Sequence, residues 1–193
     1  ATDTPLKDNK VSIKSKTEVV FPKNVVTDMF YTYQDIAVKD REESQNYDCI
    51  LKRGVTVLQL NCRQEPCPDY MKSFKYTITG NCGNVFNPTT GHCLQKTTLT
   101  RIYDISGDQL TGKRFSFSIY FFLGADNVSD ITLTTQSTDT EDKVVKSLSF
   151  ENVHMVKGKM TIYKGPFLST HSSASFIIDS PTIPDSGFST EFE

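Results

Sequence analysis

The sequence predicts an all-β protein built as a β-sandwich, on the basis of three observations. First, 23 threonines, 13 phenylalanines and 8 tyrosines in 193 residues enrich the chain in side chains that suit pleated, half-buried strands. Second, apolar and polar residues alternate with a period of two along several segments, as in strands that bury one face. Third, clusters of turn-forming residues separate these segments at fairly even intervals, which is typical of sandwiches and barrels.

The alternation is clearest around residues 115–121, where Phe115, Phe117, Ile119 and Phe121 share one face. No window shows the 3.6-residue apolar stripe of a helix, and one helical turn near 41–45 is the alternative to a solvated loop there. We therefore expect a sandwich of about 7–10 strands. The segments expected to form strands are 10–21, 34–39, 49–61, 73–79, 94–105, 113–123, 130–137, 143–150, 159–165 and 174–179.

A length of 193 residues fits one large domain or two small ones. We interpret residues 1–27 as an N-terminal strand and linker that remain from a preceding domain, 28–179 as the β-sandwich domain, and 180–193 as a tail. The tail holds two prolines and a glycine, so it is either an extended strand added at a sheet edge or a disordered end. The apolar residues that would serve such a strand-exchange tail are Phe176, Ile178, Ile183, Phe188 and Phe192.

Charge and hydropathy exclude two classes of partner. The formal net charge is -2, without the basic stripe of a nucleic-acid binder. The longest apolar run, 119–123, is far shorter than the roughly 20 residues of a membrane-spanning helix. The first ten residues lack the apolar segment of a leader, so an exported form of this chain would be a mature form or a fragment.

Four of the five cysteines lie within 32 residues, and sequence alone does not fix their pairing. Disulfides are the favoured interpretation and indicate an oxidising compartment. The nearest-neighbour pairing, Cys62–Cys67 and Cys82–Cys93, would close one small loop and one short hairpin. A zinc site is the rival, although only the C-x4-C pair is close to the usual ligand spacing. Free thiols packed as small hydrophobic groups are the third alternative. Cys49 is interpreted as a buried thiol.

Catalytic and metal-binding motifs are absent from the sequence: it contains no G-x-S-x-G, H-E-x-x-H, phosphate loop or dinucleotide fingerprint. The histidines, His92, His154 and His171, are interpreted as turn or surface residues. The acidic cluster at 139–142 and the oxygen-rich segment 124–130 fit solvated turns better than a glycosidase pair or a calcium site. We expect no enzyme, no metal and no cofactor.

Exposed aromatic rings are the remaining candidate for a binding surface, because a sugar can lie against them. The tyrosines considered for such a platform are Tyr31, Tyr33, Tyr103 and Tyr120, each of which also fits a core or strand-face position.

Four segments carry motifs that recur together in one known family. They are 28–31 (DMFY), 51–57 (LKRGVTV), 86–91 (FNPTTG) and 150–165 (FENVHMVKGKMTIYKG). They resemble four motifs of the fimbrillin superfamily of Bacteroidetes, which supplies the shaft, anchor and tip proteins of surface pili. In chain order, these motifs are the entry to the second domain, a strand, a hairpin and a late strand pair. The resemblance covers about residues 28–168.

The resemblance implies transthyretin-like, Greek-key β-sandwich domains, usually two per protein. It implies export as a lipoprotein and display at the cell surface, on the outer membrane or in the fimbrium, with any lipid anchor on a longer precursor. It also implies assembly by exchange of a terminal strand, which is physically reasonable because an open sheet edge offers unpaired backbone groups to an incoming strand.

The expected function is therefore that of a non-enzymatic, cell-surface fimbrial or adhesin component that docks with partner subunits through strand edges and loops. The alternative is a secreted, disulfide-stapled β-sandwich that binds carbohydrate or a host protein. The five cysteines and the sequon Asn127-Val128-Ser129 fit this alternative. The expected partners are other fimbrial subunits or a surface ligand, with no nucleic acid and no direct membrane span.

Overall fold

The computed structural model of the chain describes residues 12–37, 46–62, 66–105, 112, 115–168 and 177–179. These residues form fifteen β-strands and one short 3-10 helix, η1 (Pro22–Asn24). Nowhere in these ranges is there a helix that is long and apolar enough to span a membrane.

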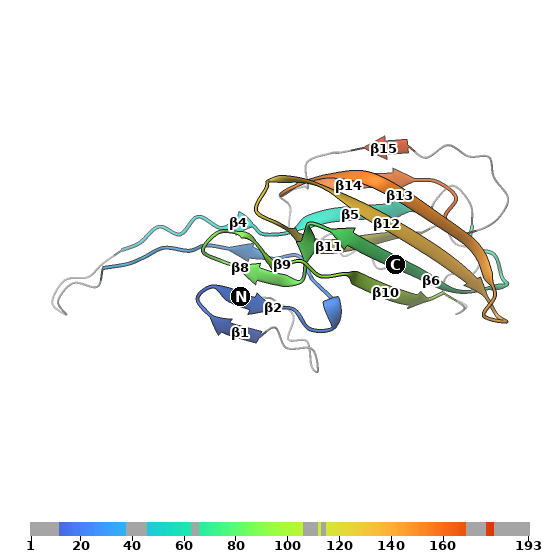
Figure 1. The fold of residues 1–193 in the computed structure, drawn as a ribbon, viewed down its shortest axis with the longest axis horizontal. Coiled ribbons are helices and arrows are strands. Elements are labelled where there is room, and N and C mark those ends of the chain that lie inside the picture. Colours follow the sequence, from blue (N-terminus) through green and yellow to red (C-terminus); the bar gives the residue numbers. More distant parts are fainter. Residues whose placement is uncertain are drawn as a thin grey trace.

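Two sheets face each other across the molecule (Figure 1). The first sheet is antiparallel throughout and contains, in spatial order, β10 (Leu99–Asp104), β6 (Met71–Gly80), β12 (Val128–Asp139) and β13 (Val144–Val156). The second contains β15 (Ile177–Asp179), β14 (Met160–Lys164), β5 (Thr56–Asn61), β11 (Ser116–Leu123) and β7 (Cys82–Gly83). In the second sheet β14 pairs with β5 in parallel, and the other pairs are antiparallel.

The main hydrophobic core lies between these two sheets. Phe74 on β6 and Phe117 on β11 meet across it with their rings stacked, 4.6 Å between centroids. Phe150 and Tyr163 make a second contact between the sheets, edge to face at 5.1 Å. Such aromatic pairs add stability beyond the burial of their area. The prediction of an all-β sandwich is confirmed, and the two facing sheets hold nine strands between them.

A smaller sheet packs against the outer face of β11. It contains, in spatial order, β1 (Ser12–Ser15), β2 (Glu18–Val20), β8 (Val85–Asn87) and β9 (His92–Gln95). A second hydrophobic cluster lies beneath it and includes Phe21, Phe86 and Phe122. Since Phe121 is in the main core and Phe122 in this second cluster, β11 is buried on both faces. Residues 12–27 thus share a sheet and a core with residues 83–95.

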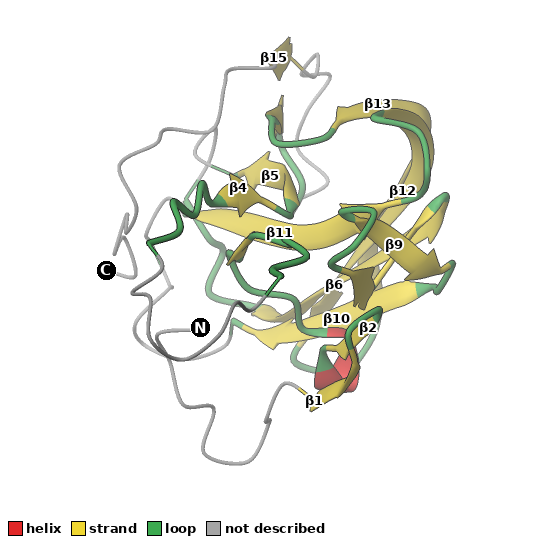
Figure 2. Ribbon diagram, turned by 90° about the vertical axis from the view of Figure 1, so that its left-hand side faces the viewer, coloured by secondary structure: helices red, strands yellow, loops and turns green. Residues whose placement is uncertain are grey.

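A two-stranded ribbon projects from the same end of the sandwich. β3 (Phe30–Tyr31) pairs with β4 (Lys52–Arg53), and the segments 32–37 and 46–51 continue outward from this pair at the left of Figure 1. Figure 2 looks at the molecule from the ribbon's side and shows β1, β2 and η1 below β11. The ribbon and the small sheet therefore occupy one end of the sandwich.

Several strand boundaries differ from those predicted. The single strand expected at 10–21 is a hairpin, because the chain turns at Lys16 and Thr17. No strand forms over 34–37, and residues 38–39 lie outside the described residues. The strand expected at 143–150 runs on to Val156 through a bulge, where Asn152 takes a positive φ of 55° opposite a register shift in β12. The alternation of apolar residues changes phase at such a bulge, so the sequence pattern ends early.

Candidate functional site

The predicted cysteine pairs are not bridged in the structure: no disulfide joins the five cysteines, all of which are described. Cys62 and Cys67 both lie in the main core, whereas Cys82 lies in the main core and Cys93 packs against the second cluster. Burial, and secondarily the neighbouring Cys93, raises the pKa of Cys82 to about 12. Protonated, buried thiols fit the alternative of cysteines packed as hydrophobic groups, and the disulfide pairing stays a prediction.

The prediction of a buried Cys49 is wrong, because this residue is exposed on the ribbon. Its Sγ lies 3.8 Å from the side-chain oxygen of Gln34 on the opposite segment. The segments of the ribbon around it are themselves exposed, so the thiol stays in contact with solvent.

Of the predicted strand-exchange tail, only Ile178 lies within the described residues. It is in β15, which pairs antiparallel with β14 at the edge of the second sheet, Ile178 opposite Tyr163. Phe176, Ile183, Phe188 and Phe192 lie outside the described residues. The described part of the tail thus adds a strand to the protein's own sheet.

The polar groups considered for chemistry are dispersed. His154 Nδ1 lies 3.1 Å from Asp130 Oδ1 on the exposed surface, and His171 is outside the described residues. In the acidic cluster, Asp139 Oδ1 accepts backbone N–H bonds from Glu141 and Lys143, so it closes a turn. Across the described part of the chain, no group of three or more His, Cys, Asp or Glu is placed to hold a metal ion.

The four tyrosines considered for a sugar platform separate into two pairs. Tyr103 packs against the main core beside Phe117, with 4.5 Å between ring centroids, and Tyr120 packs against the second cluster. Tyr31 and Tyr33 instead line a pocket of about 150 Å³ at the base of the ribbon. The structure therefore brings two of these tyrosines to one concave site.

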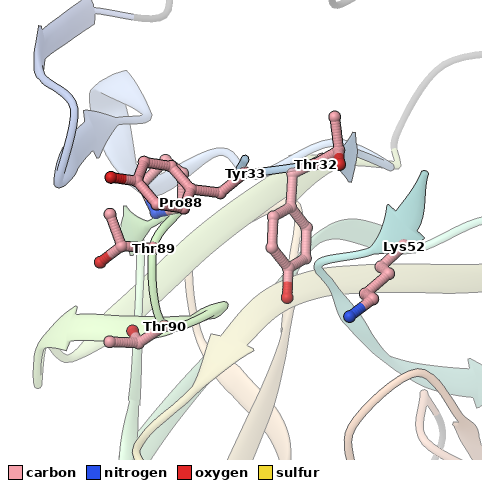
Figure 3. Close-up of a pocket in the computed structure, with 7 residues that line it drawn as sticks. Thr32, Tyr33, Lys52, Pro88, Thr89 and Thr90 are labelled. Carbon is pink, nitrogen blue, oxygen red and sulfur yellow. The ribbon is translucent and has the colours of Figure 1, made fainter. Parts of the chain in front are cut away.

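The pocket is formed by two walls. The ribbon contributes Lys52 and the successive residues Tyr31 to Tyr33, and the turn between β8 and β9 contributes Pro88 to Thr90. Figure 3 shows Lys52 on one side and Pro88, Thr89 and Thr90 on the other. The site combines two phenol groups, three threonine hydroxyls and one ammonium group.

The turn that carries the threonines is held by its own side chains. Asn87 Oδ1 accepts hydrogen bonds from the backbone N–H of Thr89 at 3.0 Å and from the Thr89 hydroxyl at 2.7 Å. Asparagine commonly closes a turn in this way, by bonding to the backbone two residues further on. Gly91 then takes a positive φ of 72°, which favours glycine.

Gly91 is also required by the packing of Tyr31. A Cβ on Gly91 would overlap the Tyr31 hydroxyl and would lie 2.8 Å from Lys157 Nζ. The ring of Tyr31 packs edge to face against Phe86, with 4.8 Å between the ring centroids. Lys157 is on the turn between β13 and β14, and its Nζ lies 5.9 Å from the centroid of the Tyr31 ring. Tyr31 is therefore fixed by contacts from three different segments.

Two lysine ammonium groups lie near the pocket and interact with each other, and the Asp35 carboxylate accepts a hydrogen bond from Tyr33. Burial, and secondarily the Lys52 ammonium, lowers the pKa of Lys157. Burial, and secondarily the Lys157 ammonium, also lowers the pKa of His92. The Gly124 backbone and Asp126 raise this pKa, but by less. Neither Lys52 nor Lys157 forms an ion pair with a described acidic residue. Their charges add to each other at the edge of the pocket.

The base of the ribbon is fixed by a two-point ion pair. Arg53 Nε and Nη2 donate to the two carboxylate oxygens of Asp28 at 3.1 and 3.0 Å, with the side chains 10% and 33% exposed. The Arg53 guanidinium also lies 4.8 Å from the ring centroid of Phe30. The Gly54 N–H donates to Met29 O at 2.9 Å, and a Cβ on Gly54 would lie 2.7 Å from Met29 Cε.

Farther out, the ribbon exposes apolar side chains. Of the eleven large apolar residues exposed among the described residues, five lie between positions 30 and 51, and Ile50 and Leu51 are 75% and 60% exposed. The two segments of the ribbon are cross-linked by side chains: Gln34 donates to Asp48 O, and the Tyr47 hydroxyl donates to Ala37 O. The five residues are Phe30, Ile36, Tyr47, Ile50 and Leu51.

Sequence reasoning identified Tyr31 and Tyr33 but missed Lys52, Lys157 and the two threonines of the turn. Lys52 lies in a segment expected to form a strand, and Lys157 lies between two such segments. Thr89 and Thr90 follow an Asn-Pro pair expected to turn. The available signal was indirect: the four segments of the family-like series all converge at this end. They form the two sides of the ribbon base, the turn from β8 to β9, and the segment from β13 to β14 whose turn carries Lys157.

Comparison of the chain with protein-family models, with curated proteins and with solved structures finds no match in any of the three.

Proposed function

We propose that this protein is a non-enzymatic, cell-surface component of fimbrial or adhesin type that docks with partner subunits. The observation that carries the proposal is the ribbon, where five large apolar side chains lie exposed on one projecting element. Exposed apolar groups that gather on one element are characteristic of interaction surfaces, whereas single ones scattered over a surface need no explanation.

The structure of the ribbon suits docking because its base is rigid and its outer part is accessible. The Asp28–Arg53 pair and the Gly54–Met29 hydrogen bond join the two sides of the base to each other. An apolar element on a fixed base loses less conformational freedom on binding than a loose chain does, which leaves more of the contact energy as affinity.

The sheet edge at β15 supplies a second element of the proposal. β15 covers the outer edge of β14 with three residue pairs, from Ile162–Asp179 to Lys164–Ile177. A strand held by so short a pairing can be replaced by an equivalent strand of a neighbouring subunit, whose backbone groups would bond to β14 in the same way. In this proposal the ribbon selects the partner and the strand edge joins it.

The test uses surface appendages sheared from the source cells and probed with an antibody to this domain, unheated and after boiling in detergent. We expect a ladder of bands that collapses on boiling, because subunits joined by strand exchange separate only on unfolding. A single band in the sheared or membrane fraction would remove the strand-exchange part. Signal confined to the medium would overturn the proposal.

A paired variant tests the ribbon. Cells that express Ile50→Asp/Leu51→Asp should secrete normal amounts of the protein but incorporate little of it into appendages. The matched control is Ile102→Asp, which places a charge on an equally exposed isoleucine of β10, away from the ribbon. Equal incorporation of both variants would contradict a docking role for the ribbon.

A further inference from the structure

We propose that the pocket at the base of the ribbon binds an acidic sugar unit of hexuronate type, a six-membered ring that carries a carboxylate. In this assignment Lys52 binds the carboxylate, and the hydroxyl groups of Thr89, Thr90 and Tyr31 bond to hydroxyls of the sugar ring. The site goes beyond subunit docking and does not depend on it, because none of the exposed apolar side chains farther out on the ribbon lines it.

The anionic character of the ligand follows from the cations at the pocket. Lys52 lines it, and Lys157 lies behind Tyr31. Within the described residues neither ammonium group has a carboxylate partner, and the two are close enough for Lys52 to disfavour the charge on Lys157. A bound carboxylate would offset this repulsion, since an opposite charge nearby favours the charged form of both amines.

The sugar character follows from the rest of the lining. Two tyrosines and three threonines line it, and its exposed surface is mainly polar, as a polyhydroxylated ligand requires. The Thr89 hydroxyl donates its proton to Asn87 Oδ1, so its oxygen remains able to accept a hydrogen bond. The Tyr33 hydroxyl donates to Asp35 Oδ1 at 3.0 Å, which orients the ring. A simple anion would use the ammonium but would gain nothing from these aromatic and hydroxyl groups.

The size of the pocket restricts the ligand to a single ring. Clefts for drug-sized ligands have about 300–1,000 Å³, and the volume here is about 150 Å³. An engineered cavity of about this volume accommodates one benzene molecule, which has six heavy atoms. A hexuronate has thirteen, so one sugar unit would enter the pocket with one side of its ring and keep the other side in solvent or joined to a longer glycan.

The pocket is also preorganised. Asn87 closes the threonine turn, Gly91 allows Tyr31 to pack against that turn, and Phe86 supports the ring of Tyr31 from below. Because these contacts already fix the lining, a ligand does not have to order it on binding, and less of the interaction energy is lost.

The experiment is an amide NMR titration of the purified chain with glucuronate and with galacturonate. Glucose serves as the neutral ring and acetate as the carboxylate without a ring. We expect saturable shifts at the amides of Thr89, Thr90 and Gly91 with at least one uronate. Affinity for glucose and for acetate should be weaker by roughly tenfold, as expected for the loss of one charge-assisted contact.

Two charge variants sharpen the titration. Lys52→Gln should weaken uronate binding by roughly tenfold, whereas Lys143→Gln, on the exposed turn between β12 and β13, should leave it unchanged. Four outcomes would overturn the proposal: no saturable shift with either uronate, equal affinity for glucose, equal affinity for acetate, or equal effects of the two variants. Since Lys52 and Lys143 are both exposed, both variants should fold, and their spectra without ligand check this.

Discussion

The two ends of the molecule use aromatic residues in different ways. In the sandwich, the buried rings of Phe74 and Phe117 stack on each other, and the partly buried Tyr103 packs against Phe117. At the ribbon end, Tyr31 and Tyr33 lie at a pocket surface beside lysine and threonine. Aromatic residues packed in or against the core serve stability, whereas tyrosines that line a pocket are available to a ligand. The comparison separates residues that hold the fold from residues that can recognise something.

The largest effect is expected from truncation of the sandwich core. Phe74→Ala removes a fully buried ring that stacks on Phe117, and Phe→Ala changes of this kind cost about 3–5 kcal/mol. Denaturant unfolding measures this loss of free energy of unfolding. Ile102→Ala on the exposed face of β10 is the control and should change stability by less than about 0.5 kcal/mol. Similar losses in the two variants would refute the division between core and surface.

A second test of the core uses alkaline pH. The Cys82 thiol ionises near pH 9.0 when unfolded, but its pKa in the folded protein is about 12. Between these values the unfolded chain loses a proton that the folded protein keeps, so the free energy of unfolding is fully present below about pH 9 and falls as the pH rises toward 12. Burial raises the pKa of Tyr76 as well, which acts in the same direction.

Urea unfolding at several pH values, under reducing conditions, measures this dependence. The loss should amount to a few kcal/mol across the window, and Cys82→Ala should make the profile flatter because one of the linked groups is gone. A stability that stays constant from pH 9 to 11 would show that these groups are not shielded from solvent in the folded protein.

At the ribbon base the expected effect is smaller and local. Arg53→Lys keeps the charge but loses the two-point geometry with Asp28, which we expect to cost about 1–2 kcal/mol. Hydrogen exchange at the Gly54 amide, which donates to Met29 O, reports the loosening directly. Lys72→Gln breaks the exposed pair with Asp142 and should cost under about 1 kcal/mol. If the Gly54 amide is equally protected from hydrogen exchange in Arg53→Lys and Lys72→Gln, the Asp28–Arg53 ion pair does not fix the base of the ribbon.

The smallest effect on stability is expected farther out on the ribbon. Ile50→Asp/Leu51→Asp replaces two side chains that are 75% and 60% exposed. The free energy of unfolding should therefore change by about 0.5 kcal/mol or less per site, as for other surface substitutions. Differential scanning calorimetry checks this. A large loss would mean that these side chains support the fold, and their exposure would then carry no information about docking.

Much of the sandwich is predictable because its strands bury one face. Phe117, Ile119 and Phe121 alternate in the sequence, and all three lie in the main core. The same strand also shows where such reasoning stops. Tyr120 and Phe122 interrupt the alternation because a second cluster covers the opposite face, and that cluster is built from β2 and β8, far away along the chain. A run of apolar residues does not say what covers its second side.

The pocket was less predictable because no local pattern defines it. Tyr31 and Lys52 become neighbours only when β3 pairs with β4, and Thr89 joins them only when the turn from β8 to β9 packs on this pair. Two of its tyrosines were recognisable as candidates from their residue type. Their separation from Tyr103 and Tyr120 depends on which rings the fold leaves open, and that is decided by long-range contacts.

The double burial of β11 has a consequence for how the molecule opens. Successive side chains from Ile119 to Leu123 belong alternately to the main core and to the second cluster. If either cluster unfolds, one face of β11 becomes exposed while the other cluster still packs against the opposite face. Partial unfolding that releases the small sheet would leave Phe122 in water while Phe121 remained packed. The intermediate is unfavourable, and the two clusters should melt as one cooperative unit. A binding site at one end of this protein is thus coupled, through a single strand, to the stability of the whole.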